Sequence, residues 1–145
     1  MAAFIKFNAV PRDLAAGVHQ LQTGTAHVFK VLLTNTAPVA TNAVKADITE
    51  ISAGNGYTAG GLACSVTSGD QTSGTFKLVL ADPATLTASG GSIGPFRYAV
   101  LYNDTPVSPL KPLLGAWDYG SALTLADGQG LVIDFSAANG VLTIA

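Results

Sequence analysis

The sequence predicts a mainly β fold, a single-domain antiparallel β-sandwich of jelly-roll or barrel type with at most one or two short helices. Residues 1–145 fall within the usual size of one domain. The 16 glycines and 7 prolines indicate many turns and few long helices. Short runs of alternating apolar and polar residues recur along the chain, separated by turn residues. No repeat of roughly 20 to 50 residues is visible, which argues against a solenoid or a propeller.

Residues 1–8 have an extended pattern, with Phe4 and Lys6 on one side and Ile5 and Phe7 on the other. Two interpretations stay open for this segment. It is an N-terminal arm that adds to a sheet edge of a neighbouring protein, or it is the first strand of its own sheet.

The next segments contain two weak helices and one strand. Residues 11–21 begin with a proline and place Leu14, Val18 and Leu21 at helical spacing, although Gly17 weakens this prediction. Residues 43–51 are a second weak candidate. Residues 27–34 are rich in β-forming residues and lead into a turn that precedes Pro38.

The middle of the chain predicts a hairpin and a buried strand. Residues 62–67 and 75–80 alternate as strands do, and the polar residues 68–74 between them are expected to form a long loop. Residues 96–102 place aromatic side chains on one face, and we expect this strand to be buried on both faces.

The C-terminal segments predict a second hairpin and a last strand. Residues 122–125 and 131–135 flank Asp127-Gly128, which is a strong hairpin signal because glycine adopts positive φ without steric cost. Asn139-Gly140 then turns the chain into a final strand over residues 141–144.

Composition excludes several kinds of partner. Only 11% of the residues are charged and the net charge is -2, so direct binding to nucleic acid is not expected. No run of 18 apolar residues is present, so we expect no membrane span. The first eight residues do not resemble a secretion signal. Cys64 is the only cysteine, which excludes an internal disulfide and favours a small buried side chain.

No pattern of residues indicates catalysis, so we expect no enzyme, no cofactor and no metal. His19 and His27 are eight residues apart and lack accompanying ligands, so we expect both at the surface or in turns. Asp82, Asp104 and Asp127 stand at turn positions. The glycine-rich residues 54–61 lead into a strand pattern, whereas a phosphate-binding loop leads into a helix.

Five stretches of the sequence carry a family resemblance: residues 33–38, 45–61, 94–104, 117–121 and 123–128. They resemble small virion proteins of tailed bacteriophages, which are described as head decoration (cement), minor structural or tail fibre proteins. The resemblance covers most of the chain and implies a β-rich fold and a structural role.

Within this group, the compact chain without heptads or repeats favours head decoration over a fibre. The resemblance implies a homotrimer that is made in the host cytoplasm and binds the major capsid protein on the outer surface of the head. There it would stabilise the shell against the pressure of packaged DNA. The residues expected at capsid or subunit contacts are Phe4, Ile5, Phe7, Tyr57, Trp117 and Tyr119.

A tail, fibre or receptor-binding protein remains the alternative. In such a protein, Tyr57, Tyr102, Trp117 and Tyr119 would stack against a carbohydrate or receptor. The competing interpretation places these aromatic side chains in the core or a subunit interface. We expect Trp117 to be largely buried, beside Tyr119 or beside the aromatic face of residues 96–102.

Overall fold

The structure is a computed structural model that describes residues 3–145. It confirms a mainly β chain whose strands pair antiparallel. Helical structure is limited to α1 (Val10–Ala15) and the single 3₁₀ turn η1 (Lys45–Asp47) within these residues. The strands are β1 (Ala3–Lys6), β2 (Phe29–Thr34), β3 (Leu62–Cys64), β4 (Val66–Thr72), β5 (Thr75–Leu80), β6 (Leu86–Thr87), β7 (Ile93–Asn103), β8 (Leu113–Leu125), β9 (Gly130–Leu131) and β10 (Leu142–Ile144).

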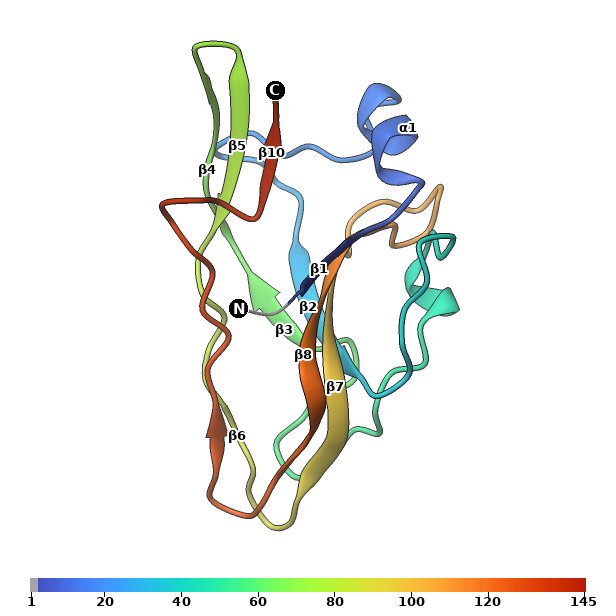
Figure 1. Ribbon diagram of the computed structural model, residues 1–145, viewed down its shortest axis with the longest axis vertical. Helices are drawn as coiled ribbons and strands as arrows, with labels where there is room; N and C mark the ends of the chain where they lie inside the picture. The colour runs from blue at the N-terminus through green and yellow to red at the C-terminus, as the bar shows by residue number, and fades with distance from the viewer. Residues whose placement is uncertain (1–2) are drawn as a thin grey trace.

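The strands form one large sheet and two small ones. The large sheet has the order β1-β8-β7-β2-β3, with the long strands β7 and β8 near its centre. One small sheet has the order β10-β5-β4, and the other pairs β6 with β9. In Figure 1 the small sheets and the C-terminal segment lie on one side of the large sheet, and residues 35–50 lie on the other.

Both faces of the large sheet are buried, as predicted for residues 96–102. Phe29, Val31 and Leu101 pack against Leu78 and Leu80 of β5 to form the core between the sheets. The opposite face forms a second core in which the alternate residues of the same strands meet α1 and the adjacent loops. Its buried members are Phe7, Val10, Leu32, Val100, Tyr102, Leu113 and Ala116.

The described part of the N-terminal segment is the edge strand of the large sheet. β1 pairs antiparallel with β8, with Ala3 opposite Asp118 and Lys6 opposite Gly115. Phe7 follows directly and is fully buried in the second core. Of the two interpretations of residues 1–8, this placement corresponds to a strand of the chain's own sheet. Met1 and Ala2 lie outside the described residues.

The predicted loop over residues 68–74 is wrong, because β4 continues through Thr72. Only Ser73 and Gly74 form the turn, and both have positive φ, 51° and 84°, as two-residue hairpin turns of type I′ require. The exposed end of this hairpin, residues 68–74, has no alternating apolar residues, so its sequence pattern does not indicate a strand. The predicted strand 62–67 is also divided, since β3 pairs with β2 and β4 pairs with β5.

The turn at Asp127-Gly128 is present, but the hairpin predicted around it is wrong. β8 ends at Leu125, and β9 after the turn pairs with β6 instead of returning along β8. This path separates residues 131–141 from β8. The final strand after Asn139-Gly140 is confirmed as β10, which pairs with β5.

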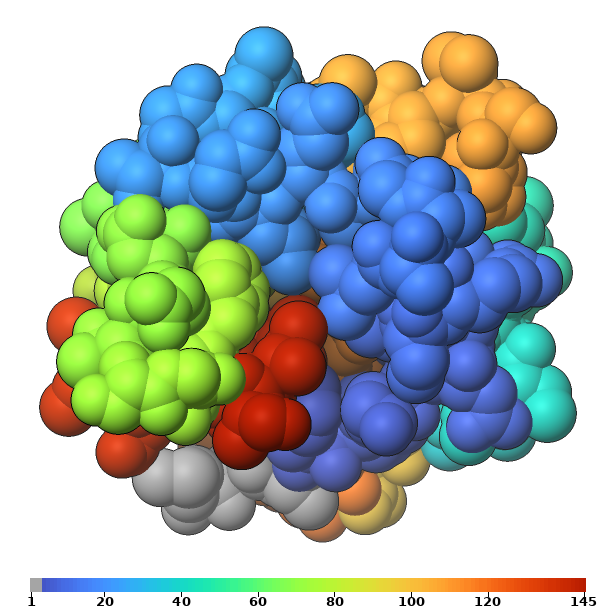
Figure 2. Space-filling view, turned by 90° about the horizontal axis from the view of Figure 1, so that it is seen from above, coloured from blue at the N-terminus to red at the C-terminus, as the bar shows by residue number. Residues whose placement is uncertain are grey.

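The two weak helices are shorter than predicted. α1 ends at Ala15. Gly17 has a φ of 72°, a left-handed conformation that stops a right-handed helix from continuing. The second candidate, over residues 43–51, reduces to η1. The segment between α1 and β2 is therefore irregular, and it covers the upper end of the molecule beside the β4–β5 hairpin (Figure 2).

Candidate binding site, an apolar groove

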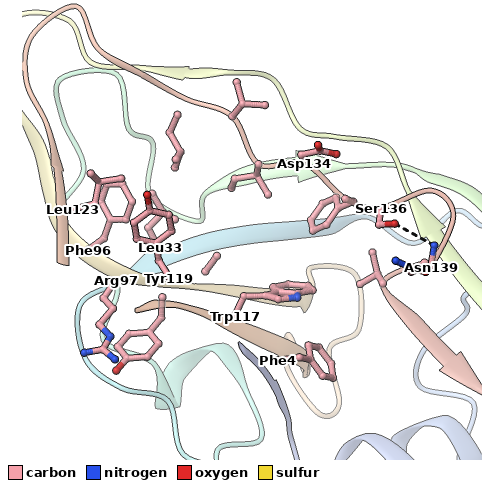
Figure 3. A pocket seen from close by; sticks show the side chains of 18 residues that line it. Phe4, Leu33, Phe96, Arg97, Trp117, Tyr119, Leu123, Asp134, Ser136 and Asn139 are labelled. Carbon is pink, nitrogen blue, oxygen red and sulfur yellow. Dashed lines mark hydrogen bonds between the residues drawn. The ribbon is translucent and has the colours of Figure 1, made fainter. Parts of the chain in front are cut away.

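An open cavity lies where β8 and residues 131–141 diverge. It has a volume of about 440 Å³, within the usual range of sites for ligands or inserted side chains. Figure 3 shows side chains of the large sheet on one side and residues of the C-terminal segment on the other. We call this cavity the groove. Its lining is mainly apolar and includes Phe4, Leu33, Phe96, Ala99, Trp117, Tyr119, Leu123, Leu131, Val132, Ile133, Phe135 and Val141.

Trp117 forms the centre of the groove wall. Its ring centroid is 5.5 Å from that of Phe4 and 5.6 Å from that of Phe135, and both pairs are tilted, an arrangement that aromatic pairs favour. The position of Phe135 is supported by its backbone N–H, which donates to Asp82 Oδ1 at 2.7 Å. Trp117 thus links β1, β8 and the C-terminal segment.

The expected environment of Trp117 is partly wrong. The side chain is half-buried, and its aromatic contacts are Phe4 and Phe135. Trp117 does not meet Tyr102 because successive side chains of a strand point to opposite faces of the sheet. Trp117 lies opposite Ala99 of β7, whereas the side chain of Tyr102 is on the other face, in the second core. The aromatic face predicted for residues 96–102 is also interrupted, since register shifts turn Phe96 toward the groove.

An irregularity in β8 brings Tyr119 to the rim of the groove. Tyr98 lies opposite Asp118 while Phe96 lies opposite Leu123, so residues 119–122 of β8 have only Arg97 as their counterpart in β7. Gly120 has a φ of 98°, and its backbone N–H donates to Asp118 Oδ1 at 2.7 Å. Bulges of this kind redirect side chains. Tyr119 is accordingly 64% exposed.

A charged pair lies beside this bulge. The Arg97 guanidinium donates to both carboxylate oxygens of Asp118, at 2.7 and 2.9 Å. Its hydrogen bond to Arg97, and then that from Gly120, lower the pKa of Asp118. The paired charges add no net charge to the rim.

The opposite wall is the irregular segment after β9. Val132 is 63% exposed and lines the groove. Asp134, labelled on this wall in Figure 3, lines it as well. Ser136 accepts hydrogen bonds from Asn139 at its side chain and from Gly140 at its carbonyl, which closes a turn at the end of the groove. Val141 then donates its N–H to Leu78 of β5. This wall is therefore anchored at both ends.

The structure brings together three of the six predicted contact residues. Phe4, Trp117 and Tyr119 all line the groove. Ile5 and Phe7 pack into the second core on the other face of the sheet, and Tyr57 is buried in a third cluster with Leu33 and Phe96.

Tyr57 holds the glycine-rich loop in place. Its hydroxyl accepts the N–H of Leu33 at 3.0 Å and donates to Glu50 Oε1 at 2.8 Å. Burial raises the pKa of Tyr57 above its ordinary value. Glu50 also accepts from Gly60 and from Lys45. This network gives Tyr57 a structural role within the chain.

The sequence reasoning missed Phe135, Val132 and Leu123 as groove residues. The available signal was the run of residues 131–135, which has four apolar side chains among five. The hairpin predicted there gave these side chains a partner strand. In the structure residues 122–125 belong to β8 but do not pair with residues 131–135, so Val132 is exposed and Phe135 meets Trp117 instead.

Cys64, the only cysteine of the chain, is free and buried. Burial raises the pKa of the Cys64 thiol to about 12, so this cysteine is a core side chain. Within residues 3–145, no three histidine, cysteine or acidic side chains are placed to share a metal ion. In the same part of the chain, no helix has the length and apolar character needed to cross a membrane.

Comparisons with models of known families, with curated proteins and with solved structures find no match for this chain.

Proposed function

We propose that this chain is a structural protein of a tailed-bacteriophage virion, which decorates the outer surface of the head as a homotrimer and stabilises the shell. The groove is the observation that carries this proposal. An apolar cavity bordered by exposed Phe4, Tyr119 and Val132 suits the side chains of another protein. The resemblance of most of the chain to small virion proteins supplies the virion and the head as its location.

The physical role follows from repeated weak contacts. A trimer on a symmetric shell makes three equal contacts at once, and their combined strength exceeds that of a single contact. Binding to the assembled shell but not to its separate subunits stabilises the shell by mass action. This stabilisation requires no contact between the protein and the packaged DNA, in agreement with its net charge of -2.

Co-sedimentation with undecorated phage heads tests this function. Wild-type protein should pellet with the heads, whereas Val132→Asp and Tyr119→Asp should weaken binding at least about tenfold by placing a charge at an apolar contact. Val107→Asp is the matched control, because Val107 is 81% exposed and does not line the groove. Wild-type protein that stays in the supernatant at saturating concentration contradicts the proposal.

A tail or receptor-binding role is the alternative, and one observation favours it. The exposed Tyr119 ring stands near the Arg97–Asp118 pair, and a ring beside polar groups is suited to binding a sugar. The predominantly apolar lining of the groove favours a protein contact instead. Wild-type binding to host cells or their glycans that Tyr119→Ala abolishes, with no binding to heads, would support the alternative.

A further inference from the structure

Two histidines meet one buried asparagine at the end of β7. Asn103 is fully buried, and its Nδ2 lies 2.9 Å from Nδ1 of His27 and 3.3 Å from Nδ1 of His19. His19 is only 5% exposed, so the expectation that both histidines lie at the surface or in turns is wrong for this one. Neither residue belongs to the groove.

The hydrogen bonds around this cluster determine its protonation state. The backbone N–H of Thr105 donates to Asn103 Oδ1 at 3.3 Å, which leaves the amide NH₂ facing the two imidazoles. The backbone N–H of Gln20 also donates to His27 Nδ1, at 3.4 Å. With the amide in this orientation, both Nδ1 atoms act as acceptors and each imidazole is neutral with its proton on Nε2. For His19 that Nε2 is buried and has no hydrogen-bond partner within the described residues.

This cluster anchors the irregular segment that joins α1 to β2. His19 and His27 stand near the two ends of residues 16–28, and both are attached to β7 through Asn103. A second anchor lies between them, where Thr23 Oγ1 donates to Asp70 and accepts from the N–H of Gly69. Leu21 is buried in the core beside this second anchor.

We propose that Asn103 and the two histidines form an acid-sensitive latch, which holds residues 16–28 on the end of β7 and releases them when an imidazole is protonated. An imidazolium carries a proton on Nδ1, so it turns an acceptor into a donor that faces another donor. If the Asn103 amide turns around, its Oδ1 can accept the Nδ1 proton of one imidazolium. The Thr105 N–H then loses its acceptor, and Nδ1 of the other histidine loses the NH₂ donor.

The surrounding charges set the pH range of release. Burial lowers the pKa of His19 to about 4, the charge of Asp13 opposes this shift, and His27 adds to it. Asp13 itself is buried and paired with Arg12. Asp104, next to Asn103, is paired with Lys30 and Lys111. The latch is therefore closed in neutral solution, and residues 16–28 are released only in acidic solution. This inference does not depend on the proposed function.

The test combines two measurements on the full chain. Long-range ¹H–¹⁵N spectra at pH 7.5 should show both histidines as the Nε2–H tautomer. Hydrogen exchange, corrected for the intrinsic rate, should show that protection of residues 16–28 falls at least about tenfold between pH 7.5 and 4, while β7 and β8 remain protected. Nδ1–H tautomers, or unchanged protection of this segment while the imidazoles titrate, would overturn the proposal.

Three variants separate a latch from a merely structural contact. Asn103→Asp offers a carboxylate to an imidazolium, so protonation should strengthen the contact instead of breaking it, and the fall in protection between pH 7.5 and 4 should disappear. The double variant His19→Gln, His27→Gln keeps acceptor oxygens without titration, so protection should become independent of pH even where Asn103→Asp fails to fold. Thr23→Ala weakens the other anchor and should lower protection by the same factor at every pH. A pH dependence retained in the double variant would contradict the latch.

Discussion

Trp117 shows how one side chain connects distant parts of this chain. Its contacts with Phe4 and Phe135 join the first strand, the long strand β8 and the C-terminal segment. Such a residue contributes to stability and also shapes the surface of the groove. Its substitution therefore affects both properties, and the two effects need separate measurements.

Replacing Trp117 by Ala should lower the free energy of unfolding by about 2 to 3 kcal/mol. This is below the range of about 3 to 5 kcal/mol for a fully buried aromatic residue, because the side chain is only half-buried. Denaturant titration measures the effect. Trp117→Phe is the matched control and should lose less than half as much, since a ring remains between Phe4 and Phe135. A loss below about 0.5 kcal/mol would contradict this account.

His19 should make stability depend on pH. Burial lowers its pKa to about 4 in the folded chain, from an ordinary value of 6.5 that applies to the unfolded chain. Between these values the unfolded state binds more protons, so the stability supplied by His19 is complete above pH 6.5 and is lost as the pH falls toward 4. The slope approaches about 1.4 kcal/mol per pH unit.

Denaturant titration of wild type and His19→Gln at pH 5, 6 and 7 checks this prediction. The difference in unfolding free energy between the two proteins should change across this range, because Gln does not titrate. Carboxylates common to both proteins cancel in the difference. A constant difference from pH 5 to 7 would contradict the shifted pKa.

At the scale of elements, β1 is the clearest target. Deleting residues 2–7 removes this strand and the fully buried Phe7, so the truncated protein should lose its folded structure. Circular dichroism and size exclusion measure the outcome. Phe4→Ser is the control, because this side chain is 46% exposed and its loss should leave the fold intact. A truncated protein that stays folded and fails to bind heads would instead support an outward arm.

The elements that could be predicted from sequence are those with a local signal. The alternation of residues 96–102 lies within one strand, and the residue types of Asn139-Gly140 by themselves favour a turn. The strand over residues 96–102 and the final strand after this turn are both confirmed. The hairpin at Asp127-Gly128 failed for a physical reason, since a turn signal does not specify which strand the chain pairs with afterward.

The groove was less predictable because it depends on packing between distant residues. Phe4 and Trp117 were expected at contacts, but their meeting requires the register of β1 on β8. The contact of Trp117 with Phe135 further requires the unpaired path of residues 132–136. The pairing of His19 and His27 through Asn103 spans 84 and 76 residues, which no local spacing reveals.

At the scale of the whole molecule, low charge and a mean hydropathy of +0.40 favour association through apolar surface. Light scattering after size exclusion should give about three times 14.7 kDa. Salt screens interactions between charges and does not weaken apolar contacts, so this mass should not change between about 0.05 and 0.5 M salt. A monomer at micromolar concentration contradicts a preassembled trimer, and dissociation at high salt would point to a charged interface.

The bulge at residues 119–122 also limits how copies of this protein join one another. Within the described residues, β1 covers β8 only from Gly115 to Asp118, so the remaining length of β8 is a possible template for a foreign strand. The extra residues break the regular spacing of its backbone donors and acceptors, and an incoming strand cannot keep its register across them. This edge of β8 is therefore a poor template for a run of identical strands, which works against polymerisation into fibrils.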